Sequence, residues 1–109
     1  MAMVVKRTEI WLVDLNPTIG KEMQKTRPCM IVSPNEANKC LDTVLIAPLT
    51  SSKRGYPSRI NCVFESKEGQ IAIDQMRSID KARLVKKLGV IDKNTALRVF
   101  TLLQEYFSL

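Results

Sequence analysis

Two polar segments of this chain gather basic side chains beside hydroxyl groups. The first, residues 17–26, contains Lys21 and Lys25 and leads to Arg27, which stands directly before the apolar run CMIV. The second, residues 50–59, reads TSSKRGYPSR and supplies Thr50, Ser51, Ser52, Lys53, Arg54, Tyr56 and Arg59. Arginine presents a planar fork that matches phosphate oxygens, and lysine adds charge on a flexible stem. If both segments leave the same side of a sheet, they form a phosphate-binding cleft.

Two charged residues next to apolar segments need a reason to be there. Arg27 stands at the mouth of an apolar strand, where it either forms a structural salt bridge to Asp14 or Glu9 or contacts an anionic ligand. Asp74 lies in the mostly apolar segment QIAIDQMRSI, where an unpaired buried carboxylate is costly. It either pairs with Arg27 or Arg77 or orients a catalytic group, and both interpretations stay open.

The composition favours a soluble, globular chain with a polyanionic partner. Of its 109 residues, 45% are hydrophobic and 26% are charged, which is typical of one folded domain, and we expect that domain to span residues 1–109. Lysine and arginine total 17 against 11 aspartates and glutamates, so the formal net charge is +6. This surplus favours nucleic acid as a partner, although a merely basic soluble protein fits the charge equally well.

Residue types exclude several classes of chemistry. The chain contains no histidine, so Ser-His-Asp triads, His-based metal sites and imidazole-dependent ribonuclease mechanisms do not apply. Cys29, Cys40 and Cys62 form no C-x-x-C pair, which predicts reduced thiols in a cytoplasmic protein without a metal or cofactor. No apolar run approaches the roughly 18 residues that span a bilayer, and residues 1–11 lack the pattern of a secretory signal.

The hydrophobic pattern predicts a strand-rich first two thirds of the chain. Strands are predicted at residues 8–15, 28–34, 43–51, 58–66 and 70–79. The second of these is nearly all apolar, which predicts burial on both faces. We also expect one helical turn at residues 35–40 with Asn35 as its cap, and a chain reversal at Glu68-Gly69.

In the last third, the period changes from that of strands to that of a helix. Asp80 is predicted to cap a short turn, and residues 86–91 to form a brief strand. Asp92 or Asn94 then caps a C-terminal helix whose apolar face comprises Ala96, Val99, Phe100, Leu103, Tyr106 and Phe107. Five or six short strands and one closing helix predict a mainly β fold, a small bent barrel with short helices and a C-terminal α-helix.

Five motifs occur in order along nearly the whole chain, from Glu9 to the C-terminal helix. They are the EIW strand, the P-x-x-G-x-E loop, TRP before an apolar strand, LTS at a strand end, and DQ-x-R-x-ID before K-x-RL. Any one of them alone is a weak signal, whereas all five in order are improbable by chance. Together they resemble the MazF/PemK (Kid-like) toxins of bacterial toxin–antitoxin systems.

The resemblance implies an SH3-like β-barrel of the CcdB/MazF type that forms a homodimer. It implies a metal-independent endoribonuclease that cuts single-stranded RNA, often mRNA, at short sequences and leaves a 2′,3′-cyclic phosphate and a 5′-hydroxyl. It also implies a cognate antitoxin whose acidic tail covers the active cleft. Arg27 and Thr50 match the family's most general catalytic pair. Glu9 and Asp74 match its acidic motif positions.

The chain departs from the Kid-like pattern at two positions. Lys21 stands where Kid-like toxins have a histidine, and Ala72 stands where they have an arginine two residues before the aspartate. A mechanism built on that trio does not carry over, so the general acid and base stay open among Asp74, Glu9 and Lys21. The mechanism that remains has Arg27 binding the phosphate oxygens and Thr50 donating a hydrogen bond to them.

RNA contacts are expected along the two basic segments and beside Asp74. The expected set is Lys21, Lys25, Ser51, Ser52, Lys53, Arg54, Tyr56, Gln75 and Arg77. Two other functions stay open, namely a non-catalytic gyrase-binding toxin resembling CcdB and an RNA-binding barrel that does not cleave. The joint presence of the TRP and LTS motifs argues against the gyrase-binding toxin.

Overall fold

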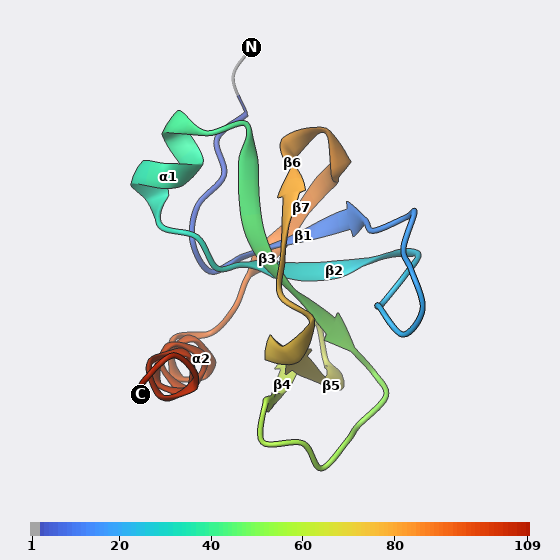
Figure 1. Cartoon of the computed structure of the whole chain (residues 1–109), viewed down its shortest axis with the longest axis vertical. Helices are drawn as coiled ribbons and strands as arrows, with labels where there is room; N and C mark the ends of the chain where they lie inside the picture. The colour runs from blue at the N-terminus through green and yellow to red at the C-terminus, as the bar shows by residue number, and fades with distance from the viewer. Residues whose placement is uncertain (1–2) are drawn as a thin grey trace.

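The computed structural model describes residues 3–109, which form a strongly bent antiparallel sheet with a long helix packed beside it (Figure 1). The elements in chain order are β1 (Glu9–Asp14), β2 (Thr26–Ile31), α1 (Asn35–Cys40), β3 (Thr43–Thr50), β4 (Arg59–Phe64), β5 (Lys67–Ala72), η1 (Ile73–Gln75), β6 (Arg77–Asp80), η2 (Lys81–Arg83), β7 (Leu84–Val90) and α2 (Lys93–Tyr106). The strand order is β4-β5-β3-β2-β1-β7, and β6 also pairs with β3. The mainly β fold with short helices and a C-terminal helix confirms the predicted class.

The strand β2 has core on both of its faces, as its nearly all-apolar sequence predicted. Cys29 and Ile31 belong to one apolar cluster, together with residues of β1, β3, β6 and β7. Met30 and Val32 belong to a second cluster, which β4, β5 and α2 close from the other side. Consecutive side chains of a strand point to opposite faces, so a continuous apolar run requires burial on both.

The segment at residues 70–79, predicted as a single strand, is two strands separated by the 3-10 turn η1. Both parts pair with β3, which matches Leu49 with Ile71 and Ile46 with Arg77. Between these two pairs β3 advances by three residues while its partner advances by six, so the extra residues are taken up in the turn. The polarity pattern does not reveal this break, because Ile73 within the turn is as buried as a strand residue.

The chain reversal between β4 and β5 lies at Glu65 and Ser66, not at Glu68-Gly69 as predicted. Both turn residues have positive φ, 52° and 63°, as tight hairpin turns require. Gly69 lies inside β5, where a Cβ atom would stand 2.6 Å from the carbonyl oxygen of Thr50. The glycine therefore permits a close approach of two backbones at the end of β3 rather than a turn.

The predicted caps are correct at two positions and wrong at one. The carboxylate of Asp80 accepts a hydrogen bond from the backbone of Ala82, and that of Asp92 accepts one from Thr95, which decides the cap of α2 in favour of Asp92. Helix α1 forms as expected, but its cap is Pro34, and no side chain caps it. The Asn35 side chain instead accepts a hydrogen bond from the backbone of Arg7.

Helix α2 packs against the second apolar cluster through the face that its spacing predicted. Val99 is fully buried, and Ala96, Phe100 and Leu103 pack against the cluster. The last turn differs from the prediction, since Tyr106 and Phe107 are exposed and contact each other edge to face at 5.5 Å. Within residues 3–109, no helix has the length and apolar character needed to cross a membrane.

Replacing Gly69 tests the close approach of β5 to β3. In Gly69→Ala the added methyl group would collide with backbone, which cannot move away as a flexible side chain does. We expect the free energy of unfolding, measured by denaturant titration, to fall by about 1–3 kcal/mol. Gly55→Ala is the matched control, because a Cβ atom there meets nothing within 4 Å. Equal stability of the two variants would contradict the assigned role of Gly69.

Candidate active site

An open hollow of about 360 Å³ lies where the end of β3 meets the start of β2 and the β4–β5 hairpin. Arg27 and Thr50 both line it. The remaining lining residues are Pro28, Leu49, Ser51, Cys62, Phe64, Glu65, Lys67, Glu68 and Gly69. Its volume falls within the range of small-molecule pockets, so it is large enough for part of a nucleotide. The structure thus brings together the two residues that the sequence placed at the centre of a phosphate site.

Strand register explains why these two residues meet. Strands β2 and β3 run antiparallel and pair Cys29 with Pro48. Two residues beyond this pair, where the β2–β3 ladder has ended and Thr50 pairs with Gln70 of β5 instead, Arg27 and Thr50 both line the hollow. The strand β1 holds the backbone of Arg27 in place by pairing it with Val13. The site is therefore built on the paired ends of strands.

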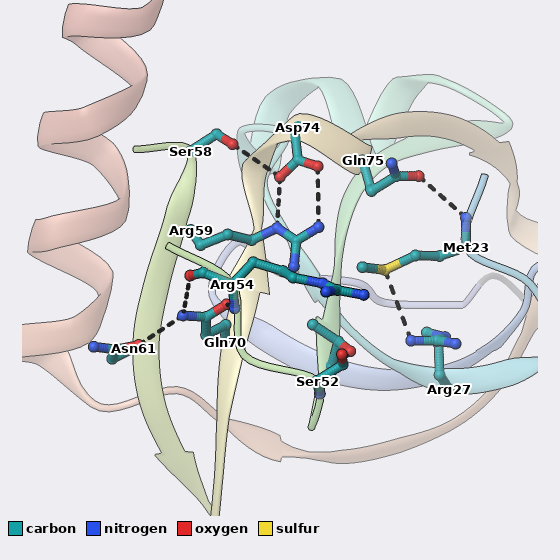
Figure 2. Close-up of polar contacts among 11 residues, drawn as sticks. Met23, Arg27, Ser52, Arg54, Ser58, Arg59, Asn61, Gln70, Asp74 and Gln75 are labelled. Carbon is teal, nitrogen blue, oxygen red and sulfur yellow. Dashed lines mark hydrogen bonds and ion pairs between the residues drawn. The ribbon is translucent and has the colours of Figure 1, made fainter. Parts of the chain in front are cut away.

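The guanidinium group of Arg27 is held by its own loop and not by an acidic side chain. Its Nε donates to the carbonyl oxygen of Gln24 at 3.2 Å. Its Nη1 lies 3.7 Å from the sulfur of Met23, as Figure 2 shows. Within residues 3–109, no carboxylate forms an ion pair with it, so the structural salt bridge to Asp14 or Glu9 is wrong. A half-buried arginine without a carboxylate keeps donors available for an incoming anion.

The hydroxyl group of Thr50 is oriented by the turn that follows β3. Thr50 is nearly buried, and its Oγ1 accepts a hydrogen bond from the backbone of Ser52 at 3.1 Å. Because this bond uses the oxygen as an acceptor, the hydroxyl proton remains free to be donated to a ligand. Ser51, next along the chain, also lines the hollow.

Asp74 is paired, but with neither of the partners that the sequence proposed. Its carboxylate accepts hydrogen bonds from Nε of Arg59 at 2.7 Å and Nη2 of Arg59 at 3.2 Å, and a third from the hydroxyl of Ser58 (Figure 2). The bonds from Arg59 lower the pKa of Asp74, and the bond from Ser58 lowers it further, although partial burial opposes them. The predicted pairing with Arg27 or Arg77 is therefore wrong.

The register of the β4–β5 hairpin explains how Arg59 reaches Asp74. Arg59 lies directly opposite Ala72, the last residue of β5, and the 3-10 turn η1 that follows brings the carboxylate of Asp74 within reach of the Arg59 guanidinium. Only 7% of the Arg59 side chain is exposed. Strand β4 thus supplies an arginine at the place where the Kid-like pattern has one in β5. The sequence alone could not reveal this, because the two positions are distant along the chain.

Glu9 lies away from the lining of the hollow and has a structural environment. Its Oε1 accepts hydrogen bonds from the backbone of Lys6 and the indole of Trp11, and its Oε2 pairs with Lys87 at 2.9 Å. Burial by itself would raise the pKa of Glu9, but the hydrogen bonds from Lys87, Lys6 and Trp11 outweigh it and hold the pKa below its usual value. The carboxylate links strands β1 and β7.

The first basic segment is anchored by two residues that the sequence had proposed for RNA contact. The side-chain oxygen of Gln75 accepts a hydrogen bond from the backbone of Met23, and Arg77 donates to the carbonyl oxygen of Leu15. Lys21 and Lys25 are exposed, and within the described part of the chain neither forms an ion pair. The segment therefore offers exposed positive charge next to backbone positions that η1 and β6 hold.

The second basic segment, residues 50–59, contains the loop that connects β3 to β4, and this loop is exposed for most of its length. The amine of Lys53 forms an exposed ion pair with Glu68 at 3.3 Å. Tyr56 is about half exposed, and one side of its ring lies 5.1 Å from the guanidinium carbon of Arg59. The arginine expected to contact a ligand is thus occupied by Asp74 and by this ring.

Gln70 is the main residue of the site that sequence reasoning missed. It is buried in β5, pairs with Thr50 of β3, and hydrogen-bonds the backbone of Arg54 through both atoms of its carboxamide. The signal was a polar side chain at the start of the apolar run IAI, and only the strand register gives it a meaning. Within residues 3–109, no group of three or more acidic, cysteine or histidine side chains could hold a metal ion.

Comparison with known proteins identifies the family of this chain. Residues 6–107 match the model of the PemK-like, MazF-like toxins of type II toxin–antitoxin systems. The chain belongs to this family. The match confirms the resemblance carried by the sequence motifs, and it covers both strands that bear Arg27 and Thr50.

Curated relatives of this family member are named endoribonucleases. Endoribonuclease PemK of Escherichia coli is 39% identical over 90 residues, which are 77% of this chain and 68% of that protein. Endoribonuclease EndoA of Bacillus subtilis is 28% identical over 94% of this chain and 93% of its own length.

Solved structures give the same fold at lower identity. MazF from Deinococcus radiodurans superposes with a TM-score of 0.86 at 22% identity, covering 99% of this chain and all of that one. A mycobacterial endoribonuclease solved in complex with its cognate antitoxin gives a TM-score of 0.77 at 23% identity and covers 93% of this chain and 92% of that one. These likenesses confirm the MazF-type barrel that the resemblance implied.

The Arg59–Asp74 pair makes stability depend on pH in a defined direction. Because folding lowers the pKa of Asp74, its stabilising contribution is complete above the unfolded value near 3.8 and is lost as the pH falls through the folded value. Asp74→Asn is expected to lower the free energy of unfolding at pH 7 by about 1–3 kcal/mol. The difference between wild type and variant should shrink below pH 4, as denaturant titrations at several pH values would show.

Glu68→Gln is the control for this measurement. It removes an ion pair whose side chains are both largely exposed, and such pairs contribute little. A smaller loss than for Asp74→Asn is expected at pH 7. If the two variants lost equal stability, the Arg59–Asp74 pair would not have the structural role assigned to it.

Proposed function

We propose that this chain is the toxin of a type II toxin–antitoxin pair and an endoribonuclease that cuts single-stranded RNA, mRNA above all, at short sequences. The observation that carries the proposal is the shared hollow, which joins an arginine without a carboxylate partner to a threonine hydroxyl with a free proton. The endoribonuclease names of the curated relatives support it. Residues 1–109 act as one domain, in the cytoplasm where mRNA is found.

The reaction we propose uses the nucleophile that RNA itself carries. The ribose 2′-oxygen attacks the adjacent phosphorus, the new 2′-O–P bond forms, and the bond from phosphorus to the 5′-oxygen breaks. The 2′-hydroxyl loses its proton and the departing 5′-oxygen gains one, so the products are a 2′,3′-cyclic phosphate and a 5′-hydroxyl. The protein has to align the attack and stabilise the charge that builds on the phosphate oxygens, and no metal is needed for either task.

Arg27 and Thr50 supply that stabilisation. The guanidinium of Arg27 binds the non-bridging oxygens as their negative charge grows, and its planar fork meets two of them at once. The hydroxyl of Thr50, held by the backbone of Ser52, donates a further hydrogen bond to the same phosphate. Both groups lie on paired strand ends, so they need no rearrangement when RNA binds.

Neither Asp74 nor Glu9 transfers a proton in the proposed reaction, and both have structural roles. Asp74 and Glu9 have lowered pKa values, so at neutral pH both are ionised and both are weak bases. We propose that Asp74 holds Arg59 beneath the ring of Tyr56, which is then presented to a base of the RNA. Glu9 stabilises the barrel and takes no part in the reaction.

Flanking nucleotides are bound through the two basic segments. Lys21, Lys25 and Arg54 contact the RNA backbone, and Ser51 and Ser52 add hydrogen bonds near the scissile phosphate. Gln75 and Arg77 hold the backbone of the first segment and of Leu15 before it, and they do not contact RNA. Such backbone contacts make binding depend on salt and carry no base specificity.

Two protein partners are proposed. One is an acidic antitoxin on the same basic surface, and the other is a second copy of the chain in a homodimer. The net charge of +6 attracts an acidic chain, and a mycobacterial relative was solved with its cognate antitoxin. Exposed apolar side chains on β7, on α2 and directly after α2, such as Val90, Leu97 and Phe107, support a contact between two copies. Light scattering should give twice the mass of one chain, and added antitoxin should stop cleavage; a monomer that antitoxin leaves active would contradict both.

The mechanism predicts how substitutions in the hollow change cleavage. Arg27→Lys keeps the charge but loses the fork, and Thr50→Val keeps the shape but loses the hydroxyl. Each is expected to lower kcat by a factor of about 10²–10³, measured on single-stranded RNA in EDTA, with products mapped for cyclic phosphate and 5′-hydroxyl ends. Lys39→Ala on α1, at the opposite end of the molecule from the β3–β4 loop, serves as the control (Figure 1).

Three results would contradict the proposal. Wild-type cleavage that stops in EDTA would contradict the metal-free reaction, and undiminished cleavage by Arg27→Lys would contradict the role of Arg27. Binding of RNA without any cleavage would leave an RNA-binding barrel in place of an enzyme.

A further inference from the structure

The side chain of Gln70 occupies an unusual place for an amide. It is about 5% exposed, within the strand that lies beside Thr50, and it shares its face with Asn61 across the hairpin. A buried amide without partners would cost a few kcal/mol, so such a residue is tolerated only where its hydrogen bonds are made. The bonds of Gln70 therefore indicate what it is there to do.

Three hydrogen bonds use both ends of this amide. Its Oε1 accepts from the backbone N–H of Arg54 at 3.0 Å, and its Nε2 donates to the carbonyl oxygen of the same residue at 3.0 Å. The second proton of Nε2 goes to the side-chain oxygen of Asn61 at 2.9 Å. The carboxamide thus pairs with Arg54 as a neighbouring strand would, although Arg54 lies in a loop (Figure 2).

The loop has little else to fix its middle. Residues 51–57 are all exposed, so apolar packing contributes little to their order. At the two ends, Ser52 is bound to Thr50, and the backbone of Arg59 to that of Tyr56. Between Ser52 and Tyr56, apart from the bonds of Arg54 to Gln70, the side-chain contact is the ion pair of Lys53 with Glu68, which is exposed and therefore weak.

The two hydrogen bonds between the Gln70 carboxamide and the backbone of Arg54, called the latch below, also fix the position from which the Arg54 side chain starts. Figure 2 shows the side chain leaving the loop and extending toward Arg27, while its backbone is bound to Gln70. Within residues 3–109, no carboxylate forms an ion pair with Arg54. Its charge is therefore free to meet a phosphate of bound RNA, and the latch decides where that charge stands.

We propose that Gln70 is a positioning residue for RNA binding, which acts by fixing the backbone of Arg54 so that its guanidinium is held for an RNA phosphate beside the hollow. The inference rests on the proposed function, and it assigns Gln70 to substrate affinity and not to the chemical step. Because the loop is ordered before RNA arrives, binding does not have to supply the entropy cost of ordering it, and KM is lower.

The experiment compares Gln70→Met, which keeps length and removes all three hydrogen bonds, with Arg54→Gln and with the double variant. Cleavage of a single-stranded RNA by the full chain gives kcat and KM, and kcat/KM is repeated over a range of salt concentrations. Gln70→Met is expected to raise KM roughly tenfold with kcat nearly unchanged. The slope of log kcat/KM against log salt should fall by about 0.7, the share of one phosphate contact on single-stranded RNA.

The double variant and a matched control separate positioning from general stability. If Gln70 acts through Arg54, the double variant should be no worse than Arg54→Gln alone. Asn61→Ala removes one bond of the same amide and leaves both bonds to Arg54, so its KM should stay close to that of wild type. A purely structural role would instead lower the melting temperature without changing the salt slope.

Two results would overturn the proposal. An unchanged KM and salt slope in Gln70→Met would do so, as would a fall in kcat alone, which would place the effect at Thr50. Should Gln70→Met fail to fold, hydrogen exchange on the wild type decides, because the latch predicts protection of the Arg54 amide and free exchange contradicts it. Wild type that cleaves no RNA defeats the proposed function itself, whereas failure confined to the variants defeats only this inference.

Discussion

The antiparallel register of β2 and β3 is the constraint on which the rest of the site depends. It pairs Cys29 with Pro48, and two residues beyond this pair on each strand Arg27 and Thr50 both line one hollow. Strand ends held by backbone hydrogen bonds are more rigid than loops, so the two polar groups stay in place without a ligand. A shift of β2 by one residue against β3 would turn the Arg27 side chain to the other face and remove the site.

The β4–β5 hairpin adds a second layer to this arrangement. Gly69 lets it approach the end of β3 closely, and two polar clusters involve its residues, one around Arg59 and Asp74 and the other around Gln70. Each cluster is internally hydrogen-bonded, which offsets the desolvation of its charges and amides. Their common effect is to hold the β3–β4 loop, so the loop carries polar groups on an ordered support.

Some charged side chains are bonded within the fold, and others have no carboxylate partner in the described part of the chain. Arg59, Arg77 and the carboxylate of Asp74 are occupied by contacts within the fold. Arg27 and Arg54 have no carboxylate partner within residues 3–109. A sequence count of positive residues does not separate side chains that are held within the fold from those that keep donors available to a polyanion. The net charge of +6 favours attraction of a polyanion, and in the proposed function Arg27 and Arg54 decide where it binds.

The sequence by itself determined most of the strands, the caps at Asp80 and Asp92, most of the buried face of α2 and the family, because local periodicity and ordered motifs are written along the chain. It also singled out Arg27 and Thr50. Tertiary structure alone decided that Arg59 pairs with Asp74, that η1 interrupts the strand predicted at residues 70–79, and that Gln70 binds the backbone of Arg54. These depend on strand register and backbone approach, which join residues far apart in sequence and leave no local pattern.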